Sequence, residues 1–222
     1  MAGDTPSFGC GCAALGGSWF TLSLWLQRSR GRKGFHLRYP SCKAGRHGIL
    51  SREGIKSAGM LKESFEALLG EIFSSLQEYY GDRLVSLAVF GSVARGTQRP
   101  DSDVDLLVVC HSLPIGRTRR IAEFGEVEKR LGPVLSDLRR QGISTDLSAV
   151  LKTPAEVERG GLFYIDLVDD ARLLYDRDDF FKGFLERLRG RLQQLGARRI
   201  QRGNAWYWDL KPDFKPGEVF EL

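Results

Sequence analysis

Residues 90–109 read FGSVARGTQRPDSDVDLLVV, and this stretch is the most informative part of the chain. Gly91 and Ser92 follow an apolar run, residues 84–90, that has the length and composition of an interior strand. Glycine lets a ligand approach the backbone closely, and the free amides of a turn that starts a helix attract phosphate. The pair therefore indicates a phosphate-binding turn at the end of a strand.

Two carboxylates follow this turn at a spacing of two residues. Asp103 and Asp105 open a second apolar run, and on a strand both would project from the same face. Two like charges repel unless a cation lies between them, and oxygen ligands suit Mg²⁺. Asp146 adds a third carboxylate from the polar face of the alternating segment 144–151. A phosphate-binding turn with three such acids predicts phosphoryl or nucleotidyl transfer with two metal ions.

Each of these assignments has a structural alternative. An isolated Asp-x-Asp is commonly a solvated turn, but here a phosphate-binding turn lies ten residues away with strands on both sides. Asp146 competes for the role of third carboxylate with Asp137, Asp166 and Asp169. Arg95 has two open roles, because a guanidinium can pair with phosphate or with an aspartate that holds the loop.

The arrangement Gly-Ser-x₁₀-Asp-x-Asp with a distal Asp resembles the polymerase-β-like nucleotidyltransferase superfamily. The tripeptide Ala94-Arg95-Gly96 and the compact size make the chain most similar to the minimal nucleotidyltransferases, which include antitoxins encoded beside HEPN-domain toxins. The resemblance covers approximately residues 60–175, and the combined motif is far more specific than its parts.

The resemblance implies a role for each motif residue. Asp103 and Asp105 would bind both of two Mg²⁺ ions, and Asp146 would bind the catalytic ion and help to deprotonate the acceptor. ATP is the implied donor, with AMP transferred and pyrophosphate released. The residues assigned to the nucleotide triphosphate are Gly91, Ser92 and Arg95.

The remaining pattern predicts an α/β (α+β) fold, a small mixed sheet flanked by helices. Apolar residues at three- and four-residue steps predict helices from Leu61 to Leu76 and over residues 117–140, where Pro133 should kink or divide the helix. Thr153 and Glu156 form a capping box that starts another helix. Strands are expected over residues 84–90, 103–110, 144–151 and 171–175, a last helix over 178–195, and an extended tail over 206–222.

The chain divides into a leader over residues 1–59, a nucleotidyltransferase domain over 60–176, and a C-terminal helix and tail over 177–222. The leader holds nine basic and two acidic side chains and 11 of the 26 glycines, whereas the remainder has a net charge of −2. We expect the leader to be disordered and natural translation to begin at Met60. The basic charge belongs to the leader, so binding of nucleic acid is not expected of the main domain.

We expect a cytoplasmic protein that does not enter a membrane. The one apolar run of the leader, residues 13–26, is shorter than the roughly 20 residues that span a bilayer. The basic cluster follows that run instead of preceding it as in a secretory signal, and the four cysteines show no disulfide framework.

Three functions remain open at this stage. The first is adenylylation of a protein side chain, a tyrosine of a HEPN-type toxin partner, by an antitoxin. The second is nucleotidyl transfer to a small molecule such as an aminoglycoside. The third is a binding module that neutralises its partner by contact. Relatives that modify drugs or tRNA carry a substantial extra domain for the acceptor, and because only 47 residues follow Tyr175, we favour a macromolecular acceptor.

Overall fold

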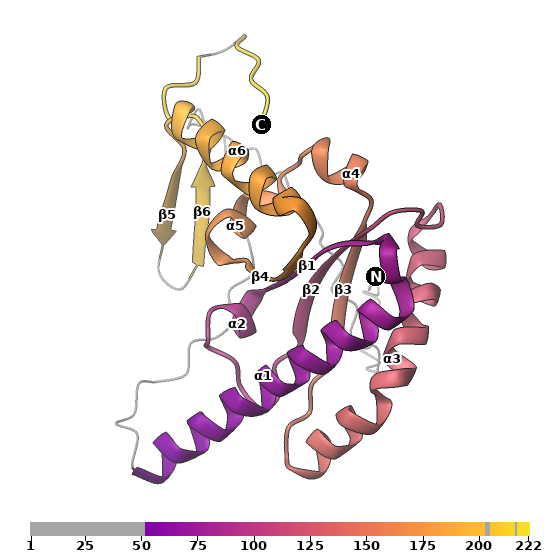
Figure 1. Ribbon diagram of the computed structural model, residues 1–222. Coiled ribbons are helices and arrows are strands. Elements are labelled where there is room, and N and C mark those ends of the chain that lie inside the picture. The colour runs from indigo at the N-terminus through magenta and orange to yellow at the C-terminus, as the bar shows by residue number, and fades with distance from the viewer. Residues whose placement is uncertain (1–51, 203–204, 216) are drawn as a thin grey trace, which may run out of the picture.

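The two apolar runs on either side of the Gly91 turn form the centre of a four-stranded sheet. The computed structural model describes residues 52–202, 205–215 and 217–222 (Figure 1). Within it β1 (Leu84–Phe90) pairs antiparallel with β2 (Val104–Cys110), and Phe90 lies opposite Asp105. β3 (Leu147–Lys152) runs parallel to β2, and β4 (Arg172–Asp176) runs antiparallel to β1. The order β3-β2-β1-β4 confirms the expected mixed sheet.

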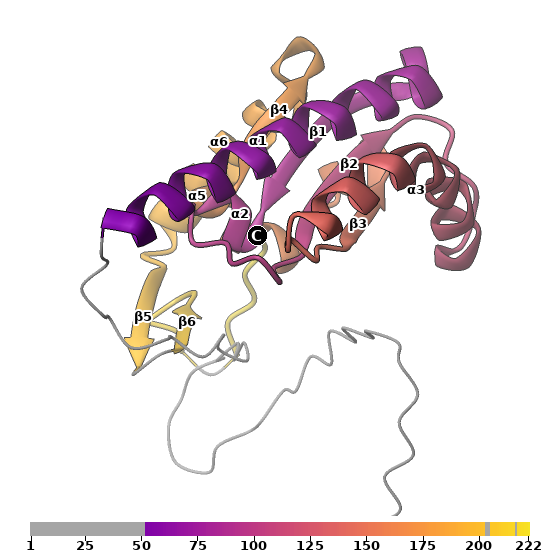
Figure 2. The ribbon, with the colours of Figure 1, turned by 90° about the horizontal axis from the view of Figure 1, so that it is seen from below.

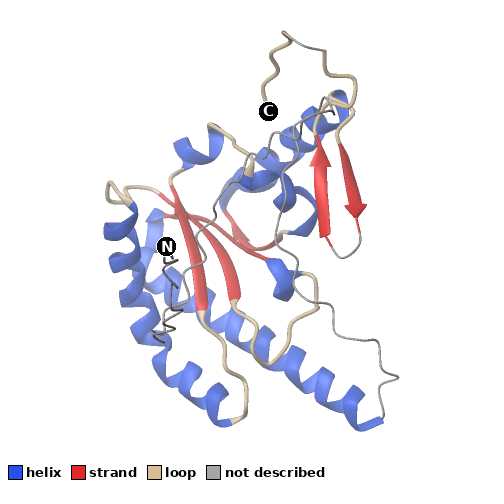
Figure 3. Cartoon of the chain, turned by 180° about the vertical axis from the view of Figure 1, so that it is seen from behind, coloured by secondary structure: helices blue, strands red, loops and turns tan. Residues whose placement is uncertain are grey.

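Helices cover both faces of this sheet (Figures 2 and 3). Leu106 and Val108 of β2 belong to the core beneath α1 and α3, whereas Leu107 and Val109 belong to the core beneath α5 and α6. Burial on both faces explains why β1 and β2 are apolar along nearly their whole length. None of the described helices is long and apolar enough to cross a bilayer. The four longer helices are α1 (Arg52–Tyr80), α3 (Arg117–Arg140), α5 (Phe163–Asp170) and α6 (Phe180–Gln194).

Short helical segments connect the strands. The capping box is confirmed, because the Thr153 side chain accepts a hydrogen bond from the Glu156 amide and the Glu156 side chain accepts one from the Thr153 amide. This cap fixes the start of α4 directly after β3. The short segments are α2 (Gly91–Ala94), α4 (Pro154–Glu158), and the 3₁₀ turns Gly81–Arg83 and Arg177–Asp179.

Three boundaries differ from the expectation. α1 begins at Arg52, so the boundary expected at Met60 falls inside a helix. Helix propagation adds one backbone hydrogen bond per residue and needs no apolar period. The apolar pattern therefore did not show that the helix begins before Met60. The leader up to residue 51 lies outside the described residues. Pro133 does not divide α3, and β3 starts at Leu147 instead of residue 144.

Only the start of the expected extended tail is paired: β6 (Ala205–Asp209) forms a hairpin with β5 (Arg198–Arg202). The sequence of β5 gives little sign of a strand, because Ile200 is its only apolar residue. Tertiary contacts hold the hairpin instead: the indole N–H of Trp208 donates to Asp166 on α5 at 2.8 Å. The helix α5, which was also not expected, is therefore what the hairpin packs against.

A partly buried ion pair fastens α4 to α3, and it predicts how stability depends on pH. Arg120 contacts Glu156 at 2.7 Å. The hydrogen bond from Arg120 lowers the pKa of Glu156 from 4.5 to about 2, against the opposing effect of burial. We expect Glu156→Gln to lower the free energy of unfolding at pH 7 by about 1–3 kcal/mol. A depressed pKa stabilises the fold above the unfolded value, so the deficit should shrink as the pH falls from 4.5 toward 2.

Chemical denaturation at several pH values measures this effect. Glu126→Gln is the matched control, because Glu126 pairs with Lys129 in an exposed position on α3, the helix that carries Arg120. Such exposed pairs contribute less than about 1 kcal/mol. A deficit for Glu156→Gln that does not change below pH 4 would show that the carboxylate charge is not the stabilising feature.

Candidate active site

The turn at Gly91, which is predicted to bind phosphate, lies against one of the predicted metal ligands. β1 ends at Phe90, and Gly91 follows with a φ of 71° and begins α2. A Cβ added to Gly91 would overlap the Oδ2 atom of Asp105 and lie 3.2 Å from its Cγ. The pairing of Phe90 with Asp105 across the two strands causes this approach. Glycine is thus required here for two reasons, the left-handed backbone and the space taken by the carboxylate.

The three predicted carboxylates lie at one end of the sheet and influence one another. Asp105 is the second residue of β2, and Asp103 precedes that strand. Asp146 precedes β3, and its carbonyl oxygen accepts a hydrogen bond from the Val104 amide at 2.9 Å. Asp103 and Asp146 therefore lie just outside the strands on which they were expected. The parallel pairing of β2 with β3 brings them together.

The charges of these acids are unfavourable in the protein alone. Burial raises the pKa of Asp105 to about 6, with a further contribution from the negative charge of Asp103. A hydrogen bond from Ser148 and the positive charge of Arg95 lower the pKa of Asp105 and partly offset this rise. Burial also raises the pKa of Asp103, and the charge of Asp146 adds to it. Concentrated negative charge of this kind is the electrostatic condition that a bound cation relieves.

The residues present fit Mg²⁺ by their chemistry. Carboxylate oxygens are the ligands that Mg²⁺ prefers, and the repulsion among Asp103, Asp105 and Asp146 favours a cation between them. Within the described ranges, no three acidic, histidine or cysteine side chains are gathered closely enough to form a ready-made metal group. The carboxylates would therefore have to draw together when a cation binds. Their roles as metal ligands stay a prediction.

The structure separates Asp146 from the other acids that competed for its role. Asp137 pairs with Arg140 on the exposed surface of α3. Asp166 accepts the indole hydrogen bond of the hairpin, and Asp169 pairs with Arg189 at 3.9 Å. Among these four acids, Asp146 is the one whose charge acts on Asp103.

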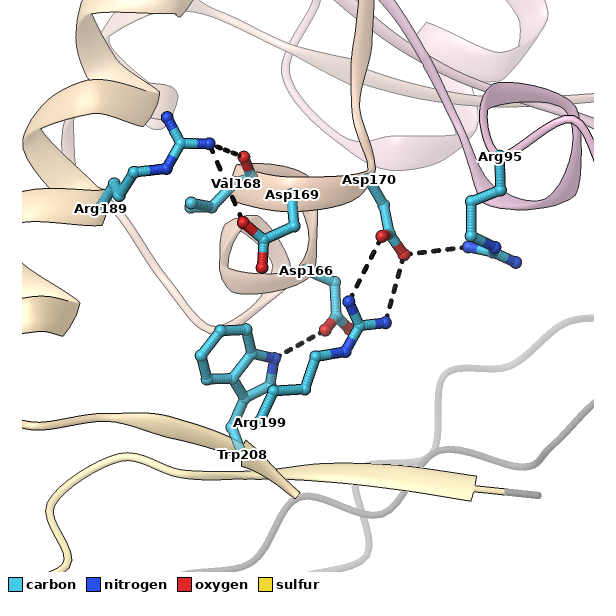
Figure 4. A network of polar contacts seen from close by, with 8 residues as sticks. All are labelled: Arg95, Asp166, Val168, Asp169, Asp170, Arg189, Arg199 and Trp208. Carbon is cyan, nitrogen blue, oxygen red and sulfur yellow. Dashed lines mark hydrogen bonds and ion pairs between the residues drawn. The ribbon is translucent and has the colours of Figure 1, made fainter. Parts of the chain in front are cut away.

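Arg95 pairs with an aspartate in this structure. Its Nη1 atom lies 3.0 Å from Oδ2 of Asp170, at the end of α5 (Figure 4). Asp170 also pairs with Arg199 of the hairpin. Because Asp170 is 75 residues away in the chain, no local pattern could predict this contact. The charge of Arg95 still reaches the site, since it lowers the pKa of Asp105.

Sequence reasoning missed a fourth carboxylate near the site. Glu128 lies on α3, where burial and the charge of Asp146 raise its pKa. Its position four residues after Phe124 places it on the buried side of that helix, a signal that was available in the sequence. α3 therefore contributes charge to the site as well as apolar packing.

Comparisons with known proteins find a matching family over the part of the chain that holds this site. The nucleotidyltransferase domain family matches residues 69–174, which contain the turn and all three acids. Over 141 residues the chain is 30% identical to the candidate protein adenylyltransferase MJ1305 of Methanocaldococcus jannaschii, and the match covers 63% of this chain and 90% of that protein. The chain belongs to the nucleotidyltransferase family. It is a nucleotidyltransferase, and the domain implies a nucleotide donor.

Solved structures similar to this nucleotidyltransferase share less of its sequence. A crystal structure of a toxin–antitoxin with AMP-PNP matches with a TM-score of 0.38 at 19% identity, over 57% of this chain and 87% of that chain. A mutant of the toxin–antitoxin MntA–HpeT matches with a TM-score of 0.38 at 20% identity, over 57% and 86%. Scores at this level assign no ligand or partner to the chain.

The contact between Gly91 and Asp105 predicts different effects for two similar substitutions. Gly91 and Gly96 have φ values of 71° and 68°, but a Cβ on Gly96 would meet nothing within 4 Å. Gly96→Ala should therefore lower the free energy of unfolding by about 1–2 kcal/mol through backbone strain alone, and activity should be retained. Gly91→Ala should in addition displace Asp105 and abolish nucleotidyltransferase activity. Equal losses of activity in the two variants would show that the approach to Asp105 does not matter.

The raised pKa of Asp105 predicts that its charge destabilises the metal-free protein. Because the pKa of Asp105 is raised in the folded protein, the neutral carboxyl contributes its full stabilisation below pH 3.8, the unfolded value. This contribution is lost as the pH rises through about 6. Without divalent metal at pH 7, the free energy of unfolding of Asp105→Asn should thus exceed that of the wild type by about 1–3 kcal/mol. The variant should therefore unfold at a higher temperature. Below pH 4 the two should converge.

Thermal melts between pH 3.5 and 8 in a chelating buffer test this sign. Asp137→Asn, on the exposed surface of α3, serves as the control and should change little at any pH. A lower stability of Asp105→Asn at pH 7 would mean that the carboxylate has a structural role.

Proposed function

We propose that this nucleotidyltransferase transfers AMP from ATP to a hydroxyl group of a protein, a tyrosine of a HEPN-type toxin partner. The observation that carries the proposal is the group of acids beside the Gly91 turn, in which Asp103, Asp105 and Asp146 share one end of the sheet. The similarity to a relative named as a candidate protein adenylyltransferase supports a protein acceptor. The resemblance to antitoxins encoded beside HEPN-domain toxins supports the partner.

The turn after β1 would hold the triphosphate of ATP. Gly91 leaves the backbone accessible, and the hydroxyl of Ser92 adds a hydrogen-bond donor. Asp103 and Asp105 would hold two Mg²⁺ ions, and Asp146 would join them at one of these. When bound, Mg²⁺ supplies positive charge that stabilises the attacking and leaving oxygens of an in-line displacement.

The chain's own acids would handle the proton of the acceptor. A tyrosine hydroxyl has a pKa of about 10, so it must lose its proton as it attacks at neutral pH. The carboxylate of Asp146 would accept that proton. The bond from the tyrosine oxygen to the α-phosphorus of ATP forms, the bond from this phosphorus to the bridging oxygen breaks, and pyrophosphate leaves.

Mass spectrometry of the co-expressed neighbouring gene product tests the proposal. The expected result is a mass increase of one or more AMP units on a tyrosine of the partner, which disappears in Asp103→Asn and Asp105→Asn. Asp146→Ala should lower kcat by about 10²–10⁴, the usual contribution of a general base, with a much smaller effect on ATP affinity. Asp137→Ala, an exposed acid of α3 paired with Arg140, is the matched control and should retain activity.

The same experiment separates this proposal from a binding module. An unmodified partner that is inhibited equally by the wild type and by Asp103→Asn and Asp105→Asn would contradict the enzymatic proposal. Transfer to an added aminoglycoside, with the partner left unmodified, would assign the acceptor to the small-molecule class instead.

A further inference from the structure

The C-terminal hairpin is attached to the site through one carboxylate. Asp170, with 12% of its side chain exposed, pairs with Arg95 at 3.0 Å and with Arg199 at 3.3 Å. Figure 4 shows the two guanidinium groups reaching Asp170 from different elements, Arg95 from the segment after α2 and Arg199 from β5. Two cations share one anion here, so the cluster carries a net positive charge beside the phosphate-binding turn.

A pocket opens on the hairpin next to this cluster, and Arg199 belongs to both. It has a volume of about 380 Å³ and is lined by Arg199, Gln201 and Trp206. Gln201 lies opposite Trp206 in the strand pairing. Arg199, two residues before Gln201, lies on the same face of β5.

The pocket and its surroundings have more hydrogen-bond donors than acceptors. In the part of the chain that the structure describes, the indole N–H of Trp206 is buried and has no hydrogen-bond partner. The guanidinium of Arg199 lies 4.3 Å from the centre of the Trp206 ring, and that of Arg95 lies 5.8 Å from it. Arg95 uses one nitrogen for Asp170, so most of its five N–H donors are not used by this contact.

These features favour an anion with several acceptor oxygens. Guanidinium groups bind phosphate by two parallel hydrogen bonds, and a carboxylate held between two arginines occupies the place that such an anion would take. A purine base is a poorer match, because it presents few acceptors and Arg199 already covers a face of Trp206. The ligand class is therefore a polyphosphate.

We propose that this pocket binds the terminal phosphates of the nucleotide donor, with Arg199 of the hairpin acting together with Arg95. The proposal rests on the function proposed above, which places a triphosphate at the Gly91 turn. Arg95 connects the two places, since it follows α2 directly and its charge acts on Asp105. The terminal phosphates would compete with Asp170 for both arginines and would draw the hairpin toward the site.

This assignment gives the hairpin a role in the reaction itself. The bond that breaks leaves negative charge on the departing pyrophosphate, and guanidinium groups held in place stabilise such charge. Arg199 would therefore bind the leaving group, whereas Asp103 and Asp105 would hold the Mg²⁺ ions at the reacting phosphorus. The hairpin lies outside residues 69–174, the part of the chain that matches the family.

Calorimetric titration of the full chain with inorganic tripolyphosphate in the presence of Mg²⁺ tests this role. Arg199→Gln should weaken binding about tenfold, the effect of losing charge-assisted hydrogen bonds to one group. The matched control is Trp208→Phe, which removes a different polar contact of the hairpin, the bond to Asp166, and leaves the pocket residues in place. Trp208→Phe should bind tripolyphosphate within about twofold of the wild type.

A second titration uses AMP, which has no terminal phosphates, and Arg199→Gln should bind it as the wild type does. Unchanged tripolyphosphate binding in Arg199→Gln would overturn the proposal. An equal loss in Trp208→Phe would show that Arg199 only docks the hairpin, and an equal loss of AMP binding would assign the pocket to another part of the nucleotide. Absence of AMP transfer in the wild type would refute the proposed function, while the tripolyphosphate comparison would still decide the role of Arg199.

Discussion

A carboxylate oxygen of Asp105 occupies the space in which any residue other than glycine at position 91 would place its Cβ. This contact exists because β1 and β2 pair so that Phe90 lies opposite Asp105, and the chain must then turn sharply into α2. The strand pairing thus sets the position of the Gly91 turn and of the Asp105 carboxylate together. A shift of one residue in this register would separate the two.

The charges of the site are unfavourable in the protein without ligands. Burial and the neighbouring negative charges raise the pKa values of Asp103 and Asp105, and Glu128 adds further negative charge from α3. Arg95 partly offsets this charge. A site of this kind is unfavourable to the fold and favourable to cation binding, which is a common relation between stability and function in enzymes. The core on both faces of the sheet provides the stability that tolerates it.

Asp170 plays a comparable organising role on the other side of the site. It lies at the end of α5, one helical turn after Asp166, and these two acids hold the hairpin through Arg199 and Trp208. The sequence of the hairpin alone does not predict a sheet. Its position depends on contacts with a helix more than 25 residues earlier, and these contacts bring a second arginine near Arg95.

The sequence by itself determined the central strands, the capping box before α4 and the family. Continuous apolar runs, the Thr153–Glu156 spacing and the motif between Gly91 and Asp105 are local patterns that physical chemistry interprets without a fold. The Asp-x-Asp pair was singled out by its spacing, but its strand was expected to begin one residue too early, because where backbone pairing begins depends on the neighbouring strand.

Only the tertiary structure decided which distal aspartate lies near that pair, what Arg95 contacts, and that residues 198–209 form a hairpin. Asp137, Asp146, Asp166 and Asp169 are equivalent as residue types, and they differ only in what the fold places beside them. The partner of Arg95 is 75 residues away, and local periodicity carries no information at that separation. Long-range pairing is set by packing of whole elements, so it becomes visible only once the sheet and its helices are in place.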